Sequence, residues 1–533
     1  MTGADVPADP GVIVEAAAGA VTMSNLGLGE QLARFALQHG GGVQAAIVLA
    51  DAIGWQGRGR EAEDLLAEWE PGHDDEPTVA RWGCLRAANL FFGCGQLASA
   101  RAVLATVRDR VRSAQMLSLA TAMDVAFAFF SGDLPDAIAL GTAALDPAML
   151  AQAIPDAVVW TSLATAGALA LSGRFSEVSA AAAAGERAAA QCESGPQRYA
   201  LALAEVLAST AAGTLGAARQ VCDRYAAMSE GAPADCAGPT IATALIGRVE
   251  LARGRLDAAC RSLQTSVFTM PDGLPPGWPM LVASWLAQAE AARGDVDAAA
   301  AALAKAEAAQ GPQVNVFAPE LELARAWLAA ASGETSTAQQ HAERAAQLAR
   351  TGGMGAVELT ALHTALRFGD RSCDARIQRL AGRLDGPLAQ AIAVHSRGVA
   401  ERDGARLIDA AERFERIGAL VLACDAAAHA AREHARAGHR GGELEAATRA
   451  HWLASQCGAT TPALRCATDP LPLTEREWEI ANLVGSGLSN RKIADRLCLS
   501  VRTVDGHLYR MFAKLGVEDR DQLGKLVRFR PAT

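Results

Sequence analysis

The sequence predicts an all-α protein, in which an α-solenoid of about ten helical hairpins is followed by a four-helix domain at the C-terminal end. Three observations support this prediction. Half of the 533 residues are hydrophobic but only 5% are aromatic, and alanine, the strongest helix former, is abundant. A glycine-centred pattern recurs about every 40 residues. The last sixty residues contain several helix caps and helix-ending glycines. A chain of this length is too long for one compact core.

The repeat consists of a glycine, a polar residue and usually an apolar residue. Its best examples begin at Gly95, Gly132, Gly173, Gly213, Gly254, Gly294 and Gly333. Gly57 extends the series backward, and Gly369, Gly404 and Gly438 extend it forward less regularly. The fifth residue after the glycine is usually alanine, as in Ala62, Ala100, Ala137, Ala218, Ala259, Ala299 and Ala338, with Val178 as the exception.

This pattern predicts stacked helical hairpins. One helix ends, glycine takes the left-handed turn that other residues resist, and a second helix begins within a few residues. The alanine is expected where the two helices cross closely. A fixed period near 40 residues indicates a solenoid that resembles tetratricopeptide-like repeats, although the period exceeds 34 residues and the tryptophan-tyrosine consensus is absent. The alternative is a long irregular all-α domain.

Composition divides the chain into four parts. Residues 1–12 are expected to be disordered, and residues 13–457 form the solenoid, interrupted by the breaker-rich stretch Pro271–Pro279. Residues 458–472 contain three prolines and no helical period, so they are expected to form a linker. Residues 473–533 form the C-terminal domain.

The C-terminal domain begins with a capping box, in which Thr474 and Glu477 satisfy free backbone groups of the first helical turn. Gly485 and Gly487 end that helix, Ser489 caps a second helix, and Ser500 caps a third helix that ends at Gly516. A fourth helix is expected from Arg520 to Arg528. Two short helices joined by a tight turn, the second with a polar outer face, form a helix-turn-helix.

These residues resemble the LuxR-type (GerE-like) DNA-binding domain over roughly the last 60 residues. The matching segments are Leu473–Glu477, Gly487–Ala494, Ser500–His507 and Lys514–Val517, followed by Arg520. The alternative is an ordinary helical bundle that closes a longer helical protein. The solenoid resembles the repeat region of the large ATP-binding LuxR regulators. No GxxxxGK[ST] motif occurs in this sequence, so the ATPase of those regulators is missing from this chain, and ATP-gated activation is not expected.

The resemblance implies a set of DNA contacts. The third helix is expected to enter the major groove of double-stranded DNA, where Asp505, Gly506 and Tyr509 face base edges. Arg502, one turn earlier, could reach guanine or a phosphate. Asp505 replaces the usual basic residue, and it either accepts a hydrogen bond from cytosine N4 or pairs with Arg502; we favour the pair. The predicted phosphate and sugar contacts are Asn490, Arg491, Thr503, His507 and Lys514.

The resemblance also implies dimerisation. In the family the last helix pairs two domains on a two-fold related site, so Arg520, Leu523, Leu526 and Val527 are the candidate dimerisation residues, and a homodimer is expected at least on DNA. The alternative, which is compatible with the first, is that the leucines close the small core.

Charge and cysteine content fit an intracellular DNA-binding protein. The net charge is −10, but residues 473–533 carry 11 Arg and Lys against 8 Asp and Glu, a local charge of +3, so the rest carries −13. Eleven scattered cysteines without a CxxC pair argue for reduced thiols. Neither a signal peptide nor an apolar run of membrane-spanning length is present, so a cytoplasmic protein that contacts no membrane is predicted.

No catalytic residue, metal ligand or cofactor is predicted. The sequence shows no nucleophile–base pairing. His429, His434 and His439 are five residues apart and cannot share one helix face, so we expect an exposed or partly packed set. The predicted function is therefore that of a sequence-specific transcriptional regulator whose solenoid binds an unknown ligand or protein partner and controls DNA binding. The alternative is a protein-interaction scaffold or anti-regulator with weak or vestigial DNA binding.

Overall fold

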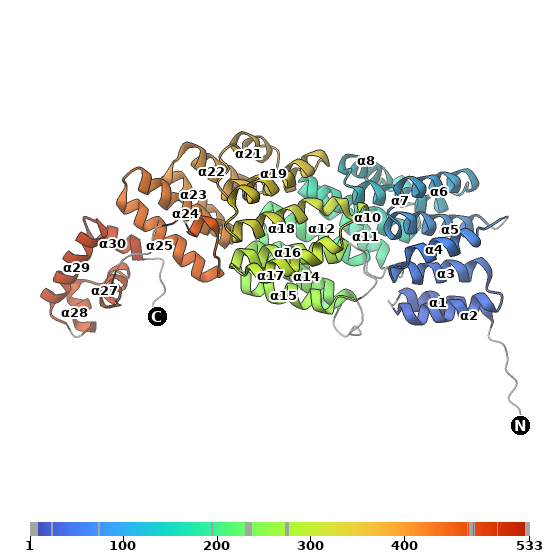
Figure 1. Cartoon of the computed structure of the whole chain (residues 1–533), viewed down its shortest axis with the longest axis horizontal. Helices are drawn as coiled ribbons and strands as arrows, with labels where there is room; N and C mark the ends of the chain where they lie inside the picture. Colours follow the sequence, from blue (N-terminus) through green and yellow to red (C-terminus); the bar gives the residue numbers. More distant parts are fainter. Residues whose placement is uncertain are drawn as a thin grey trace, which may run out of the picture.

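The computed structural model describes residues 9–22, 25–72, 75–192, 197–229, 237–271, 277–465, 467, 473, 475–497 and 499–527. Within these ranges all regular structure is helical, and twelve successive helix pairs are followed by the C-terminal domain (Figure 1). The pairs are α1 (Pro10–Thr22) and α2 (Leu26–Gln38), α3 (Gly42–Trp55) and α4 (Gly59–Glu68), α5 (Glu76–Ala88) and α6 (Leu97–Arg110), α7 (Ala114–Ser131) and α8 (Leu134–Ala144), α10 (Pro155–Ser172) and α11 (Phe175–Ala189), α12 (Gln197–Ala212) and α13 (Leu215–Met228), α14 (Ala237–Arg253) and α15 (Leu256–Thr269), α16 (Gly277–Arg293) and α17 (Val296–Ala308), α18 (Ala318–Ala331) and α19 (Thr335–Thr351), α20 (Gly355–Arg367) and α21 (Asp374–Ala381), α22 (Pro387–Glu401) and α23 (Gly404–Ile417), α24 (Leu420–Arg436) and α25 (Arg440–Cys457).

Short helical segments complete the chain. They are α9 (Pro147–Leu150), α26 (Pro462–Arg465), a π-helical turn (Asn89–Gly93) after α5, and a 3-10 helix (Pro312–Phe317) before α18. The C-terminal domain consists of α27 (Glu475–Gly485), α28 (Asn490–Leu497), α29 (Val501–Leu515) and α30 (Arg520–Val527). It lies at one end of an elongated molecule, and the first helix pairs lie at the other (Figure 1).

The repeat glycines make the predicted turns. Ten of the eleven have backbone φ angles between +68° and +103°, the left-handed region in which glycine carries no steric cost. Gly404 is the exception, because Arg402 takes the left-handed position at φ 57° and Gly404 becomes the first residue of α23. A Cβ atom at Gly404 would collide with the His434 ring, so glycine is required there for close packing and not for the turn.

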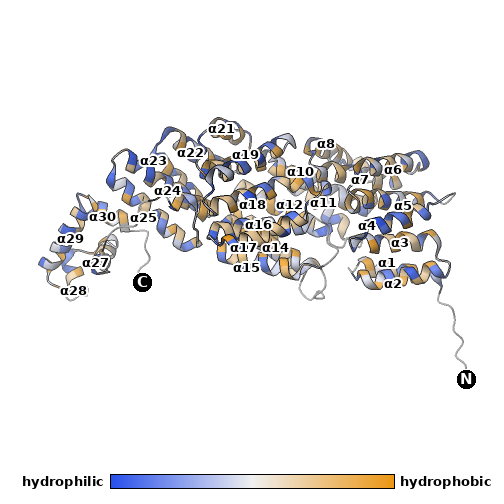
Figure 2. Cartoon of the chain, viewed as in Figure 1, coloured by the Kyte–Doolittle hydropathy of each residue, from blue (hydrophilic) through white to orange (hydrophobic). Residues whose placement is uncertain are grey.

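The repeat alanines lie in the interior of the solenoid. Ala62, Ala100, Ala137, Ala218, Ala259, Ala299 and Ala338 are completely buried, and Val178 is 2% exposed. This complete burial is what the prediction of a small residue between two closely packed helices requires. Hydrophobic residues concentrate along the stacked helices, whereas α28 in the C-terminal domain is largely hydrophilic (Figure 2).

Hairpin turns also contact chain segments far ahead in the sequence. The backbone N–H of Leu134 donates to the Gly352 carbonyl at 3.3 Å, and the N–H of Thr460 donates to the Ala292 carbonyl at 2.8 Å. The Asn315 side chain donates to the Ser131 carbonyl at 3.1 Å. Successive coils of the superhelix are therefore in direct contact. The repeat pattern alone did not predict these contacts.

The first part of the predicted linker of residues 458–472 contacts the solenoid. Thr461 is completely buried and donates a hydrogen bond to Asp425. The Arg465 guanidinium donates to the Ala331 carbonyl at 3.1 Å. Residues 459–465 therefore pack on the solenoid, because their polar groups bond to backbone carbonyls of α16 and α18 and to a carboxylate of α24.

Three buried histidines form a chain of hydrogen bonds through the first helices of successive pairs. His363 on α20, His395 on α22 and His429 on α24 are each at most 3% exposed. Nε2 of His363 lies 2.9 Å from Nδ1 of His395, and Nε2 of His395 lies 3.0 Å from Nδ1 of His429. We call these three residues the histidine ladder. The expectation of an exposed or partly packed set is therefore wrong for His429. Its partners lie at the same place in neighbouring repeats and not on its own helix, so the spacing within one helix could not reveal them.

Burial lowers the pKa of all three ladder rings below the ordinary value of 6.5, because a charged ring there would lose its hydration. The pKa of His395 falls to about 3. The Arg367 guanidinium adds to the effect and is itself held by Asp425 at 2.7 Å in a buried ion pair.

One described helix, α7, has the length and apolar composition of a membrane span. Eight of its 18 residues are buried in the structure, and α7 packs against α5, α8 and α10. Such burial is typical of a core helix in a helical repeat.

Candidate nucleic-acid interface

The C-terminal domain closes around a small apolar core. Ile480, Ala481, Val484, Ile493, Ala494, Val504, Leu508, Met511, Leu515, Val517, Leu523 and Leu526 are buried together. The cluster also includes Leu444 of α25, which is 5% exposed. The last solenoid helix therefore supplies one side chain to the core of this domain.

Local signals place the helices as the sequence predicts. Ser500 caps α29, because its Oγ accepts a hydrogen bond from the Thr503 N–H at 3.0 Å. Gly487 and Gly516 have φ angles of 77° and 65° and end α27 and α29. Thr474, the first residue of the predicted capping box, lies outside the described residues. The order α28, tight turn, α29 is a helix-turn-helix.

The outward face of α29 is open to solvent. Arg502, Asp505 and Gly506 are exposed, and the Tyr509 side chain is 77% exposed. Asn490 on α28 donates to Asp505 at 2.7 Å. The described part of the chain contains no ion pair between Arg502 and Asp505, so the favoured pair is replaced by the Asn490 bond. A carboxylate held by an amide from the neighbouring helix has a fixed orientation on this face.

The five predicted phosphate contacts differ in their surroundings. Arg491 is exposed, and Thr503 is exposed with its hydroxyl 2.7 Å from that of Ser500. His507 is half-buried, with its Nδ1 3.4 Å from the Arg510 guanidinium. Asn490 is engaged by Asp505. With Lys514, which pairs with Glu477, four of the five positions already have side-chain partners within the domain.

Lys514, the fifth predicted contact, makes an ion pair with a buried carboxylate. Its Nζ lies 2.9 and 2.8 Å from the two oxygens of Glu477. The side chain of Lys514 is 40% exposed, whereas that of Glu477 is 6% exposed. Lys514 therefore joins the C-terminal end of α29 to α27.

The sequence analysis missed several basic residues on the same two helices. Lys492, Arg496 and Arg510 are exposed. Together α28 and α29 carry six Arg and Lys against two Asp, a net charge of +4 in a chain of net charge −10. The sequence does indicate these basic residues, because they lie between the apolar core positions of the two helices, where a helix faces solvent. Such a surface attracts phosphate groups.

The residues predicted for dimerisation lie partly inside the domain. Leu523 and Leu526 are buried in its core. Arg520 donates to the Leu488 carbonyl and to Asn490, which ties α30 to the start of α28. The side chain of Val527 lies outside the described residues. Helix α30 packs on α27 and on α25 of the solenoid.

Comparison with known proteins agrees with this geometry. Residues 471–527 match the family described as bacterial regulatory proteins, luxR family. The C-terminal domain is a LuxR-family helix-turn-helix domain. The match covers this domain alone, and the DNA-binding character of the chain rests on it.

Solved structures similar to the chain are helical proteins. The Rap protein complexed with Competence and Sporulation Factor is 10% identical over 70% of this chain and 99% of its own, with a TM-score of 0.44. The APC/C hetero-tetramer Cut9–Hcn1 is 13% identical over 87% and 97%, with a TM-score of 0.33. Yeast Tom70 is 12% identical over 85% and 90%, with a TM-score of 0.28. At these TM-scores the repeat architecture rests on the twelve helix pairs themselves.

Proposed function

We propose that the protein is a sequence-specific transcriptional regulator whose solenoid receives a ligand or protein partner and controls DNA binding by the LuxR-family domain. The observation that carries this proposal is the exposed, basic helix-turn-helix at one end of a large helical repeat. The proposed setting is the cytoplasm, and the proposal includes no catalytic step.

In the proposed complex α29 lies in the major groove of double-stranded DNA. Arg502, Asp505, Gly506 and Tyr509 face the base edges, because they form the exposed side of this helix. Asp505 is suited to accept a hydrogen bond from cytosine N4, and Asn490 orients its carboxylate. Sequence preference therefore depends on the side chains of Arg502, Asp505 and Tyr509.

Contacts to phosphate orient the domain in this proposal. Arg491, Thr503 and His507 lie beside the base-reading positions, and the missed Arg510 lies one turn beyond His507. Lys514 reaches a phosphate only by sharing its ammonium group with Glu477. Asn490 contributes by orienting Asp505.

The contact with α25 gives a route for control. Leu444 is buried in the domain core, and the Arg440 side chain lies against Gly516 at the end of α29. A change in the last hairpin therefore changes the position of the domain. Helix α30 is engaged by α25, so we propose that homodimerisation through α30 on a two-fold related site competes with this contact.

Selection of bound duplexes from random DNA tests the proposal on the full chain. Enrichment of a two-fold motif by wild type, and a changed motif for Arg502→Ala, is the expected result. The scaffold alternative is supported by Asp505 on the reading face and by the acidic body. The scaffold alternative is favoured if neither the wild-type chain nor the Leu444→Ala variant enriches any DNA sequence.

A further inference from the structure

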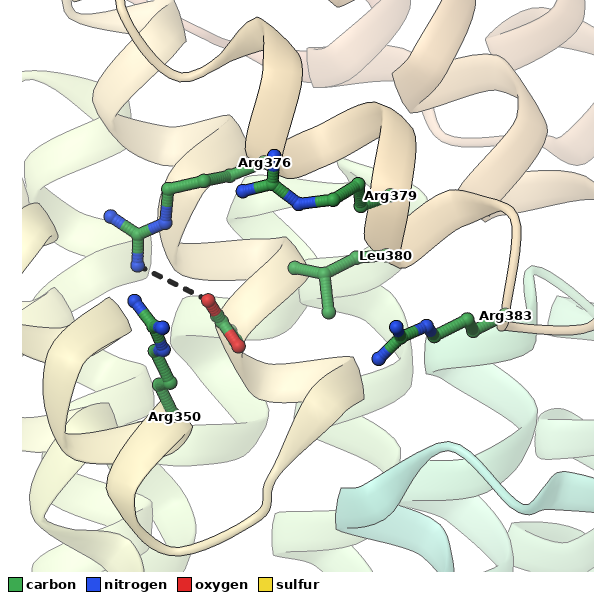
Figure 3. A pocket seen from close by; sticks show the side chains of 6 residues that line it. Arg350, Arg376, Arg379, Leu380 and Arg383 are labelled. Atoms are coloured by element: carbon green, nitrogen blue, oxygen red, sulfur yellow. Dashed lines mark hydrogen bonds and ion pairs between the residues drawn. The ribbon is translucent and has the colours of Figure 1, made fainter.

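A cavity of about 260 Å³ lies between the end of α19, helix α20 and helix α21, far in sequence from the DNA-binding domain. Its lining consists of Arg350, Glu358, Arg376, Arg379, Leu380 and Arg383. Figure 3 shows the arginine side chains around a common space, with the Leu380 side chain between them. We propose that this cavity binds a small phosphate-bearing molecule.

Charge is the first argument. Four guanidinium groups and one carboxylate line the cavity, which leaves an excess of three positive charges. Arg376 pairs with Glu358 at 3.1 Å and with Glu343, just outside the lining, at 2.5 Å. In the part of the chain that the structure describes, Arg350, Arg379 and Arg383 have no hydrogen-bond or ion-pair partner for their guanidinium groups. This excess lies in a body whose charge is strongly negative.

The arrangement on α21 is the second argument. Arg376 and Arg379 lie on α21 three residues apart, and Arg383 follows two residues after the end of this helix. Like charges three residues apart destabilise a helix. A bound anion would remove that repulsion. The Nε of Arg376 is also buried without a hydrogen-bond partner, and a buried donor of this kind requires an acceptor.

The chemistry of the lining selects the ligand class. Guanidinium groups form paired hydrogen bonds with phosphate oxygens, and several of them can surround one tetrahedral group. A phosphate ester or diphosphate carries two or three negative charges and neutralises the excess, whereas a monocarboxylate leaves most of it. Leu380 offers an apolar surface to the organic part of such a molecule. The cavity volume fits a metabolite, not a folded partner.

The inference goes beyond the proposed function and does not depend on it, because binding is measured on the full chain without DNA. Calorimetric titration with sodium pyrophosphate at physiological ionic strength is the test. Arg379→Gln combined with Arg383→Gln removes two exposed, unpaired guanidinium groups. Arg101→Gln combined with Arg261→Gln is the matched control, because both residues are exposed on helices that do not line the cavity.

Saturable binding to wild type and the control, with a dissociation constant raised about tenfold or more in the cavity variant, is expected. Succinate is expected to bind more weakly than pyrophosphate. Unchanged melting temperatures in both variants exclude misfolding. Equal affinities in the cavity variant and the control would overturn the inference, as would the absence of saturable binding to wild type. If random duplex DNA competes with pyrophosphate for wild type but not for the cavity variant, the cavity contacts the DNA backbone and not a metabolite.

Discussion

The histidine ladder predicts that the last hairpins of the solenoid loosen in mild acid. The ladder rings have pKa values well below 6.5 in the folded chain. In the unfolded chain they regain their ordinary pKa, so between pH 6.5 and the lowered values the unfolded state binds more protons. The ladder therefore contributes stability that is fully present above pH 6.5 and is lost as the pH falls below it.

The size of the loss follows from the number of rings. Lowering the pH from 7 to 5 costs about 2 kcal/mol for each ring that stays neutral when folded, and about 6 kcal/mol for three. Each of the two N–N contacts can hold one proton, so the ladder can accept one extra proton at an outer nitrogen without breaking a contact. If it does, the loss falls to about 4 kcal/mol.

Amide hydrogen exchange measures this loss locally. Peptides from α20, α22 and α24 are expected to lose about 4–6 kcal/mol of protection between pH 7 and pH 5, after correction for the intrinsic pH dependence of exchange. Helices α14 and α16 contain no histidine and provide the internal comparison. A loss below about 1 kcal/mol in the ladder helices, or the same loss in α14 and α16, would refute the reasoning.

Four substitutions test other parts of the structure. Tyr509→Ala is expected to change the sequence selected from random DNA, at a cost of about 1–3 kcal/mol on the preferred site, and equal losses on preferred and random duplexes would contradict its base-reading role. Lys514→Ala is expected to weaken binding to all sequences, to reduce the salt dependence and to lower the unfolding free energy of the domain in urea by about 1–2 kcal/mol; lost stability with unchanged affinity would make Lys514 purely structural. Leu444→Ala is expected to weaken the contact with the domain by about 2–3 kcal/mol and to increase the dimer fraction on DNA in analytical ultracentrifugation, whereas a strictly unchanged fraction would remove α25 from the control mechanism. Gly173→Ala is expected to lower the melting temperature more than Gly333→Ala, because both glycines have positive φ but only Gly173 is crowded by a neighbouring side chain; equal shifts would show that coil-to-coil packing at Gly173 is unimportant.

The repeat was predictable from the sequence because its signals are local. A glycine with positive φ and an alanine five residues later report on one hairpin and need no knowledge of the rest of the chain. Contacts between coils are different. The hydrogen bond from Leu134 to Gly352 joins two segments that no sequence pattern relates to each other. Which hairpins meet is set by the superhelical pitch, and this pitch is the sum of small rotations over several hairpins.

The DNA-binding site was predictable as a set of helices but less so as a set of contacts. Exposure of Arg502 and Tyr509 follows from helical spacing. The partners of Asp505 and Lys514 lie on other helices, so sequence spacing within α29 could not reveal them. The histidine ladder was missed for a related reason. His363, His395 and His429 are 32 and 34 residues apart in the sequence, and only the stacking of successive repeats brings them into contact.

The contacts between coils also determine how the solenoid responds to force. A superhelix with separated coils stretches like a spring, because each unit touches only its neighbours. Here the bonds from Leu134 to Gly352 and from Thr460 to Ala292 join the coils side by side, so extension requires several of them to break at once. The middle of the molecule should therefore behave as a stiff rod. Elastic motion is then left to the first two helix pairs and to the junction at α25, from which the DNA-binding domain projects.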